Sequence, residues 1–178
     1  MAPKPAFELP YFYNYRPYFT LQPVRDTREK QIQLWKELIL SFCKHYGMYI
    51  VDVDDFPLFA NKSIERKLTN EARELFLNAL VMEGRAEWLG KDHRKCLLLW
   101  RRIEDWADLI ISWVQENALE NGVVTLDEMR TGDEARGTDL ENLEMIILER
   151  AVRLLEARGK AQMFKGSSAD DTGVKFFI

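Results

Sequence analysis

The chain contains two copies of one amphipathic pattern, and this repetition constrains its fold more than any other feature. The segment WKELILSF begins at Trp35 and returns as WADLIISW, which begins at Trp106. In each copy the apolar residues recur three and four positions apart, a spacing that predicts one buried stripe along a helix. Because a repeat indicates repeated structural units, we expect two similar domains.

The segments that follow each predicted helix also correspond in order. After the first helix come MYIVDV, the basic segment NKSIERKL, the amphipathic run EARELFLNALVMEG, and two strand-like stretches, RAEWL and KCLLLW. After the second come VVTL, DEMRTG, LENLEMIILERAVRLLEARG, KAQMF and VKFFI. Both orders indicate helix, short strand, two helices, strand, loop and strand, which is the winged-helix arrangement. We therefore predict a mostly helical α+β protein with an extended proline-aromatic arm (residues 1–25) and two tandem winged-helix domains (residues 26–102 and 103–178).

Charge and hydropathy narrow the class of protein further. The net charge is −4 and the isoelectric point is near 5.4, which argues against a chain whose main task is to coat phosphate backbones. Apolar runs such as CLLLW fall far short of the roughly 20 residues that span a membrane, and the N-terminus lacks a signal pattern. Cys43 and Cys96 lie in apolar surroundings and resemble buried thiols of a reducing compartment. We therefore expect a cytosolic protein.

A winged helix raises the alternative of a nucleic-acid-binding or transcription-associated protein, whose third helix would read the major groove. Such a helix presents Arg, Lys, Asn or Gln to base edges. The acids at the start of the two predicted third helices are Glu71, Glu74, Asp139, Glu141 and Glu144. Basic residues at Lys62, Arg66, Lys67, Lys91, Arg94 and Lys95 are interleaved with acids. Because carboxylates repel phosphate, this alternative is the less favoured one.

The sequence shows no catalytic constellation. Cys43, His45, His93 and Cys96 could together supply zinc ligands, but Cys43 and His45 are two apart on a predicted helix and would point in different directions. The acidic residues Asp52, Asp54 and Asp55 lack the spacing of a calcium-binding loop. We expect a non-enzyme without a metal or a cofactor.

The stretch FELPYFYNYRPYFTLQP, residues 7–23, is rich in aromatic rings and proline and contains PYF twice. Proline stiffens the backbone, so rings beside it lose little conformational entropy when a partner binds them. Two interpretations stay open: the arm packs on its own first domain, or it is bound by another protein. In the second case, truncation should leave both domains folded. An adaptor function for WW or SH3 domains is disfavoured, because Pro-Pro-x-Tyr and PxxP patterns are missing.

Several segments together are similar to one known family. The segment FELPYFYNYRPYFTLQPVRDTREKQ, followed in order by SFC, PLF, RKL, EWL, WRR and GVKFF, resembles the vacuolar protein-sorting-associated protein 25 family, the small subunit of the endosomal complex ESCRT-II. The matches extend over nearly the whole chain. One departure is Arg16, which stands where the family's second arm motif usually has the first of two prolines.

The resemblance implies a non-catalytic role in sorting ubiquitinated cargo to multivesicular bodies, in the cytoplasm and peripherally at endosomal membranes. It implies docking on the two larger ESCRT-II subunits through the arm and the first winged helix, with two copies in each heterotetramer. Carried onto this chain, the docking residues are Pro10, Tyr11, Phe12, Pro17, Tyr18 and Phe19. The second winged helix is expected to recruit an ESCRT-III subunit of the charged multivesicular body protein 6 type. No family motif locates that face, and our candidates are the third-helix face and Val123, Val124, Thr125 and Leu126.

Overall fold

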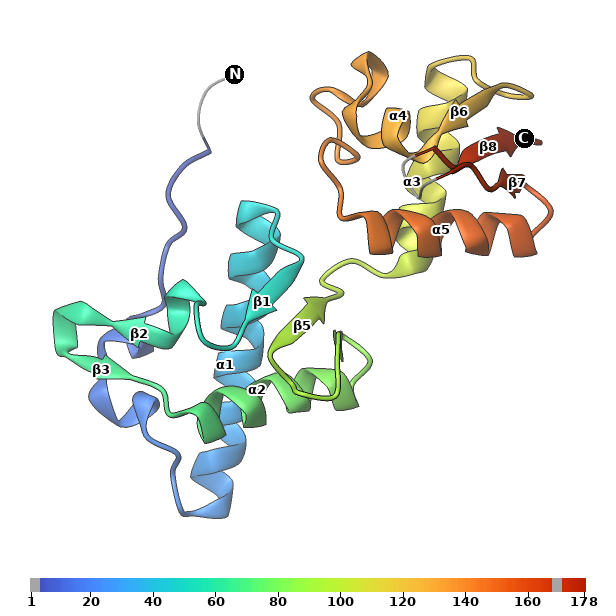
Figure 1. Ribbon diagram of the computed structural model, residues 1–178. Helices are drawn as coiled ribbons and strands as arrows, with labels where there is room; N and C mark the ends of the chain where they lie inside the picture. The colour runs from blue at the N-terminus through green and yellow to red at the C-terminus, as the bar shows by residue number, and fades with distance from the viewer. Residues whose placement is uncertain (1–3, 168–170) are drawn as a thin grey trace. The chain divides into compact units, whose positions relative to one another are not determined.

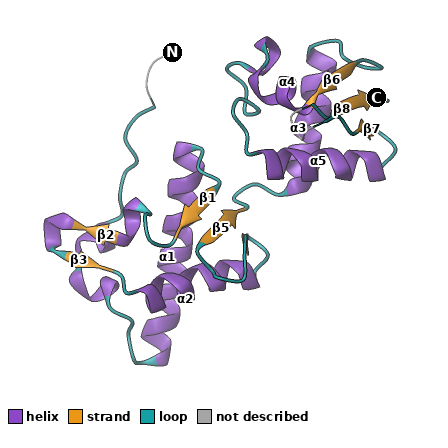
Figure 2. Ribbon diagram, viewed as in Figure 1, coloured by secondary structure: helices purple, strands orange, loops and turns teal. Residues whose placement is uncertain are grey.

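The computed structural model describes residues 4–167 and 171–178. The chain divides into two compact units, residues 1–100 and residues 101–178, and each is described by itself (Figure 1). Residues 4–25, which we expected to form a separate arm, lie within the first unit. Helices predominate over short strands in both units (Figure 2).

The first unit is built on two helices and a small antiparallel sheet. Its elements are η1 (Tyr11–Asn14), η2 (Arg16–Phe19), α1 (Arg25–Tyr46), β1 (Ile50–Asp52), η3 (Pro57–Phe59), β2 (Ala60–Asn61), η4 (Lys62–Ile64), β3 (Arg66–Lys67), α2 (Asn70–Met82), β4 (Ala86–Trp88) and β5 (Lys95–Leu98). The strands pair in the order β1-β5-β4, with Val51 opposite Cys96 and Trp88 opposite Cys96. Helix α1 ends at Gly47, whose left-handed φ of 64° suits a residue without a side chain.

The middle helix that we predicted over the basic segment of the first unit is wrong. Residues 60–67 instead form a 3-10 turn between the two short strands β2 and β3, where Ala60 pairs with Lys67. The side chain of Asn61 accepts hydrogen bonds from the backbone N–H and the hydroxyl of Ser63. Glu65 then takes a left-handed conformation, with φ of 54°. These local bonds offer the backbone an alternative to a helix.

The second unit follows the winged-helix order. Its elements are α3 (Ile103–Glu116), β6 (Val123–Thr125), α4 (Leu126–Thr131), η5 (Asp133–Ala135), α5 (Met145–Ala157), β7 (Ala161–Phe164) and β8 (Gly173–Phe176). The sheet order is β6-β8-β7. Helix α5 begins later than the apolar run suggests, because Leu140 and Leu143 are buried from turns that precede the helix.

The repeated pattern forms the cores of both units, as its spacing predicts. Trp35 and Ile39 are fully buried on α1, and their counterparts Trp106 and Ile110 are fully buried on α3. In each unit the N-terminal helix packs against the helix that precedes the wing, α1 against α2 and α3 against α5. The α+β fold of two tandem winged helices is thus confirmed, although the arm is not extended. Within the described residues, no helix is both long and apolar enough to cross a bilayer.

Candidate protein-binding site

The first PYF motif turns back onto the first unit. Pro10 is extended, with φ of −67° and ψ of 155°, and its carbonyl oxygen accepts the N–H of Tyr13 at 3.1 Å, which opens the 3-10 turn η1. With about three residues per turn, successive side chains point in different directions. Phe12 and Tyr13 are therefore buried, whereas Tyr11 is 86% exposed.

The second PYF motif behaves in the same way. Pro17 stands near the start of η2, and the N–H of Thr20 bonds to its carbonyl oxygen at 3.2 Å. Phe19 is buried, Tyr18 is half-buried, and Pro17 and Tyr15 are exposed. The extended arm that we predicted is therefore corrected to two consecutive 3-10 turns, because each proline is followed by a backbone hydrogen bond that closes a turn.

The buried rings of the arm surround one side chain of α1. The rings of Phe12, Tyr13 and Phe19 lie 6.1, 6.2 and 5.3 Å from the ring of Trp35, all near edge-on. On the other side, Phe76 of α2 stacks on Trp35 at 5.5 Å with an interplanar angle of 8°. Edge-to-face and offset aromatic pairs of this kind add to the stabilisation that burial provides. The arm thus completes the core of the first unit.

Polar groups hold the arm in place as well. The hydroxyl of Tyr13 donates to the carbonyl oxygens of Leu58 and Ala60 at 3.0 and 3.1 Å, and burial raises the pKa of this phenol to about 12. The buried amide of Gln31 donates to the carbonyl oxygens of Tyr18 and Thr20 at 3.1 and 2.9 Å. Because these buried polar groups are satisfied, the conformation of the arm is well specified.

The surface of the arm keeps two shallow grooves against α1. One, of about 310 Å³, is lined by Pro10, Tyr11, Leu34 and Leu38 with neighbouring residues. The other, of about 360 Å³, is lined by Tyr15, Pro17, Tyr18, Thr27, Lys30 and Gln31. Of the six predicted docking residues, Pro10, Tyr11, Pro17 and Tyr18 therefore retain surface that a partner can reach. Phe12 and Phe19 belong to the core, a division that the repeated motif does not reveal.

The four candidate residues of the second unit also differ in exposure. Val123 is 62% exposed, Val124 and Thr125 are half-buried, and Leu126 is fully buried. Thr125 is the N-cap of α4: its hydroxyl accepts the N–H of Glu128 at 3.0 Å, and the Glu128 carboxylate accepts the N–H of Thr125 at 2.8 Å. Sequence reasoning missed this capping box, although the T-x-x-E spacing signals it. A groove of about 380 Å³ beside the strand is lined by Trp113, Leu119, Val123, Val124 and acidic neighbours.

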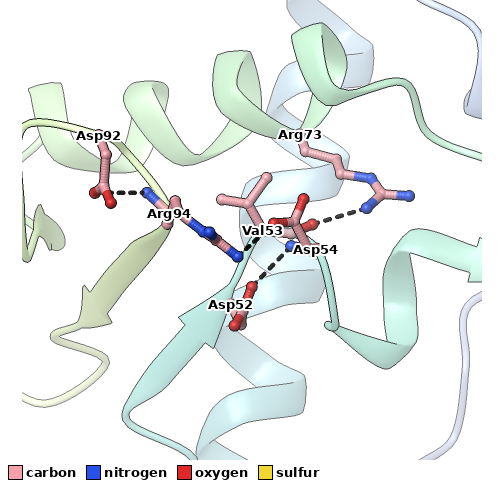
Figure 3. Close-up of polar contacts among 6 residues, drawn as sticks. All are labelled: Asp52, Val53, Asp54, Arg73, Asp92 and Arg94. Atoms are coloured by element: carbon pink, nitrogen blue, oxygen red, sulfur yellow. Dashed lines mark hydrogen bonds and ion pairs between the residues drawn. The ribbon is translucent and has the colours of Figure 1, made fainter.

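In helix α2, which we predicted as the third helix of the first unit, the arginine and one carboxylate are already engaged. The guanidinium of Arg73 in α2 donates to the carbonyl oxygen of Val53 at 2.7 Å (Figure 3). It also donates to the carbonyl oxygen of Leu68 at 3.0 Å. The Glu74 carboxylate lies 2.6 Å from Nδ1 of His93 in the wing, and that imidazole stacks on Trp88 at 4.4 Å. The wing is thereby tied to the helix by a carboxylate, which opposes binding of a nucleic-acid backbone.

One basic group of the first wing, Arg94, is paired with an acid. The guanidinium of Arg94 lies 3.2 Å from the Asp54 carboxylate, and the N–H of Arg94 bonds to Asp92 (Figure 3). The N–H of Asp54 bonds to the Asp52 carboxylate at 2.9 Å, so the acidic stretch after β1 forms a turn. In the second unit, Asp139 pairs with Arg101 at 3.0 Å.

Among the described residues, the cysteines and acids do not assemble a metal centre. Cys43 and Cys96 are fully buried, and burial raises the pKa of each thiol to about 12, so both remain protonated at neutral pH. Metal ligation needs the thiolate. In residues 4–167 and 171–178, no group of three or more His, Cys, Asp or Glu residues could hold a metal ion.

These features define a class of protein: a tandem winged-helix protein whose accessible aromatic surface suits contact with other proteins. A family model described as ESCRT-II complex subunit matches residues 12–144. The chain belongs to this family of ESCRT-II subunits.

Individual relatives agree with that membership. The chain is 60% identical over 173 residues to vacuolar protein sorting-associated protein 25 of Arabidopsis thaliana, with 97% of both chains covered. It is 43% identical over 175 residues to vacuolar protein-sorting-associated protein 25 of Danio rerio, covering 97% of this chain and 99% of the relative. The similarity therefore extends across both units.

Solved structures are similar as well. The crystal structure of subunit VPS25 of the endosomal trafficking complex ESCRT-II matches with a TM-score of 0.83 and 25% identity, covering 94% of this chain and 98% of that one. A chain of the crystal structure of endosomal complex ESCRT-II (VPS22/VPS25/VPS36) matches with a TM-score of 0.80 at 25% identity, with the same coverage.

Proposed function

We propose that this chain is a non-catalytic structural subunit of ESCRT-II that docks on the two larger subunits through its arm and first winged helix. Its membership of the ESCRT-II family and its likeness to a chain solved within that complex support the assembly role. The proposal includes two copies in each heterotetramer, action in sorting ubiquitinated cargo to multivesicular bodies, and a peripheral position at endosomal membranes. It requires no cofactor.

The observation that supports the docking proposal is the difference in exposure between the two rings of the first PYF motif. Phe12 anchors the turn in the core, and Tyr11 is exposed beside a groove that Leu34 and Leu38 help to line. A ring held by a rigid turn loses little conformational entropy when it is covered by a partner. Tyrosine is also among the residues that dominate binding energy at protein interfaces.

The docking test substitutes exposed rings one at a time. We expect Tyr11→Ala to weaken co-assembly with the two larger subunits by about tenfold or more, as loss of an interface anchor does. Met82→Ala is the matched control, because Met82 is as exposed as Tyr11 and lies at the end of α2 in the same unit. Affinities are measured by titration calorimetry. Unchanged affinity for Tyr11→Ala, or an equal loss for Met82→Ala, contradicts the proposal.

Truncation of the arm is the wrong experiment for this protein. Deletion of residues 7–21 removes Phe12, Tyr13 and Phe19 from the core, so unfolding of the first unit would mimic a loss of binding. We expected both domains to stay folded after truncation only if the arm did not pack on its own domain. The arm does pack there, so that condition is not met. Single substitutions at exposed positions separate binding from folding.

The second winged helix is the proposed site for the ESCRT-III subunit of the charged multivesicular body protein 6 type. Its support is the groove beside β6, where Leu119, Val123 and Val124 offer apolar surface next to the carboxylates of Glu128 and Asp133. We expect Val123→Asp to reduce binding of that ESCRT-III subunit while assembly with the larger subunits is unchanged. If the Val123→Asp complex binds ESCRT-III normally, this groove is not the recruitment site.

A further inference from the structure

The second PYF motif lies beside the β2-β3 hairpin of the first unit. The 3-10 turn η2, which contains this motif, contacts β3. The side-chain amide of Asn61 in β2 donates to the carbonyl oxygen of Tyr13 at 2.8 Å and to Oδ1 of Asn14 at 3.3 Å. Figure 1 shows both strands next to the N-terminal segment. Arg16, at the start of η2, is therefore close to the hairpin, although the two segments are far apart in the sequence.

The hairpin has one side that faces the arm and one that does not. In antiparallel strands, directly paired residues point to the same side. Arg66 is paired with Asn61, whose side chain bonds to the arm, so Arg66 points to the arm side. Lys67 is paired with Ala60 and points to the opposite side. Arg16 and Arg66 are both exposed, and they therefore belong to one surface beside the second PYF motif.

Positive charge accumulates where the arm and the hairpin meet. Residues 12–20 and 60–67 contain one carboxylate, Glu65, and four cations, which are Arg16, Lys62, Arg66 and Lys67. Within the described part of the chain, none of these four cations forms an ion pair. The chain as a whole has a net charge of −4, so this region is opposite in sign to the protein that contains it.

The groove beside the second PYF motif is also basic. Among its described lining residues, which include Pro17 and Tyr18, the one charged side chain is that of Lys30, and it is exposed. The groove beside the first PYF motif differs, because its described lining contains the carboxylates of Glu8 and Glu37 and no cation. The two motifs of the arm thus lie in surroundings of opposite charge.

We propose that the surface of Arg16 and Arg66, with the adjoining groove at Pro17 and Tyr18, binds an acidic segment of one of the larger ESCRT-II subunits. This inference rests on the proposed function and adds to it the charge of the partner segment. Carboxylates suit the surface because a guanidinium pairs with a carboxylate through two parallel hydrogen bonds. An anionic bilayer suits it less well, because a few cations alone hold a protein on such a surface only weakly.

Exposed charges at the rim of an interface act mainly on the rate of association and on its dependence on salt. The field of such a charge extends about 10 Å at 0.1 M salt and about 3 Å at 1 M. We therefore expect Arg16 and Arg66 to accelerate the encounter with the larger subunits at low salt and to contribute little at high salt. A contact made by Pro17 and Tyr18 alone would not depend on salt in this way.

The test measures the association rate of the full chain with the two larger subunits by surface plasmon resonance, at salt concentrations from about 0.1 to 1 M. Arg16→Glu and Arg66→Glu should each slow association by about fivefold or more at the lowest salt and approach the unsubstituted chain at the highest. Arg16→Lys keeps the charge and should restore most of the rate. Lys67→Glu is the matched control, because it reverses a charge on the opposite side of the same hairpin, and it should change the rate by less than about twofold.

Three outcomes would overturn the inference: association of Arg16→Glu and Arg66→Glu at the unsubstituted rate at every salt concentration, an equal loss for Lys67→Glu, or a loss confined to binding of phosphatidylcholine and phosphatidylserine vesicles. Both arginines are exposed, so their substitution should leave the Tm unchanged, and thermal unfolding of each variant checks this.

Failure of the ESCRT-II proposal is recognised separately. In that case the unsubstituted chain does not assemble with the larger subunits, or Tyr11→Ala assembles as well as it does. Failure of the present inference alone leaves the effect of Tyr11→Ala in place and removes only the effect of the charge reversals.

Discussion

The indole N–H of Trp35 donates a hydrogen bond to the carbonyl oxygen of Tyr18 at 2.8 Å, and this bond joins the buried face of α1 to the arm. The counterpart of Trp35 in the second unit, Trp106, is covered differently: the guanidinium of Arg101 lies 4.4 Å from the centre of its ring. The repeated tryptophan thus has an aromatic cover in one unit and a cationic one in the other. The arm is therefore a structural part of the first winged-helix domain.

We expect Phe19→Ala to lower the free energy of unfolding of the first unit by about 3–5 kcal/mol, because it removes a buried ring and leaves a cavity against Trp35. Urea denaturation followed by tryptophan fluorescence measures the change. Tyr11→Ala is the control, and it should change the stability by less than about 0.5 kcal/mol, as exposed substitutions do. Equal effects of the two substitutions would show that the arm does not pack as described.

Alkaline pH should destabilise the first unit. Burial raises the pKa of Tyr13, Cys43 and Cys96 to about 12, above the ordinary pKa of 10.0 for the phenol and 9.0 for the thiols. Between the unfolded and folded pKa values the unfolded chain binds fewer protons, so the stability falls as the pH rises through this window. For Tyr13 alone, the loss between pH 10 and 12 is on the order of 2–3 kcal/mol.

The measurement is the urea midpoint at a series of pH values from about 8 to 11, where the unfolded phenol and thiols begin to ionise. Tyr13→Phe should make the decline shallower above pH 10, while the thiols still produce a decline from about pH 9. A midpoint that stays constant over this range would contradict the burial of all three groups.

Thr125→Ala should destabilise the second unit by about 0.5–2 kcal/mol, because the substitution removes the N-cap of α4. Thr125→Ser retains the hydroxyl and should restore most of the stability. Thermal unfolding followed by circular dichroism compares the three proteins. If alanine and serine are equivalent, the capping bonds contribute nothing measurable, and Thr125 can be interpreted as a surface residue alone.

Duplex DNA should not bind measurably at physiological salt. Helix α2 of the first unit has its arginine bonded to a backbone carbonyl oxygen and a carboxylate paired with the wing, so this helix presents no cation that would displace counterions from a groove. Fluorescence anisotropy at several salt concentrations checks this expectation. Tight binding that weakens steeply with salt would support the nucleic-acid alternative instead.

Particular residues show how far the sequence predicted the site. The two PYF motifs predicted the arm as a docking segment, and that prediction assigned Tyr11 and Phe12 the same role. The structure exposes the first and buries the second. Likewise, Val123 and Leu126 belong to one short segment, yet one is exposed and the other is fully buried at the start of α4. Short irregular segments lack a periodicity from which the direction of each side chain can be inferred.

The sequence by itself determined the two units and the order of their main elements, because the spacing of apolar residues along a helix is a local property that a reader can count. Only the tertiary structure decided that the arm belongs to the core of the first unit. That outcome depends on α1 and α2, which bring Trp35 and Phe76 together as a surface on which Phe12 and Phe19 are buried. Residues so far apart in the chain come into contact only when the chain folds.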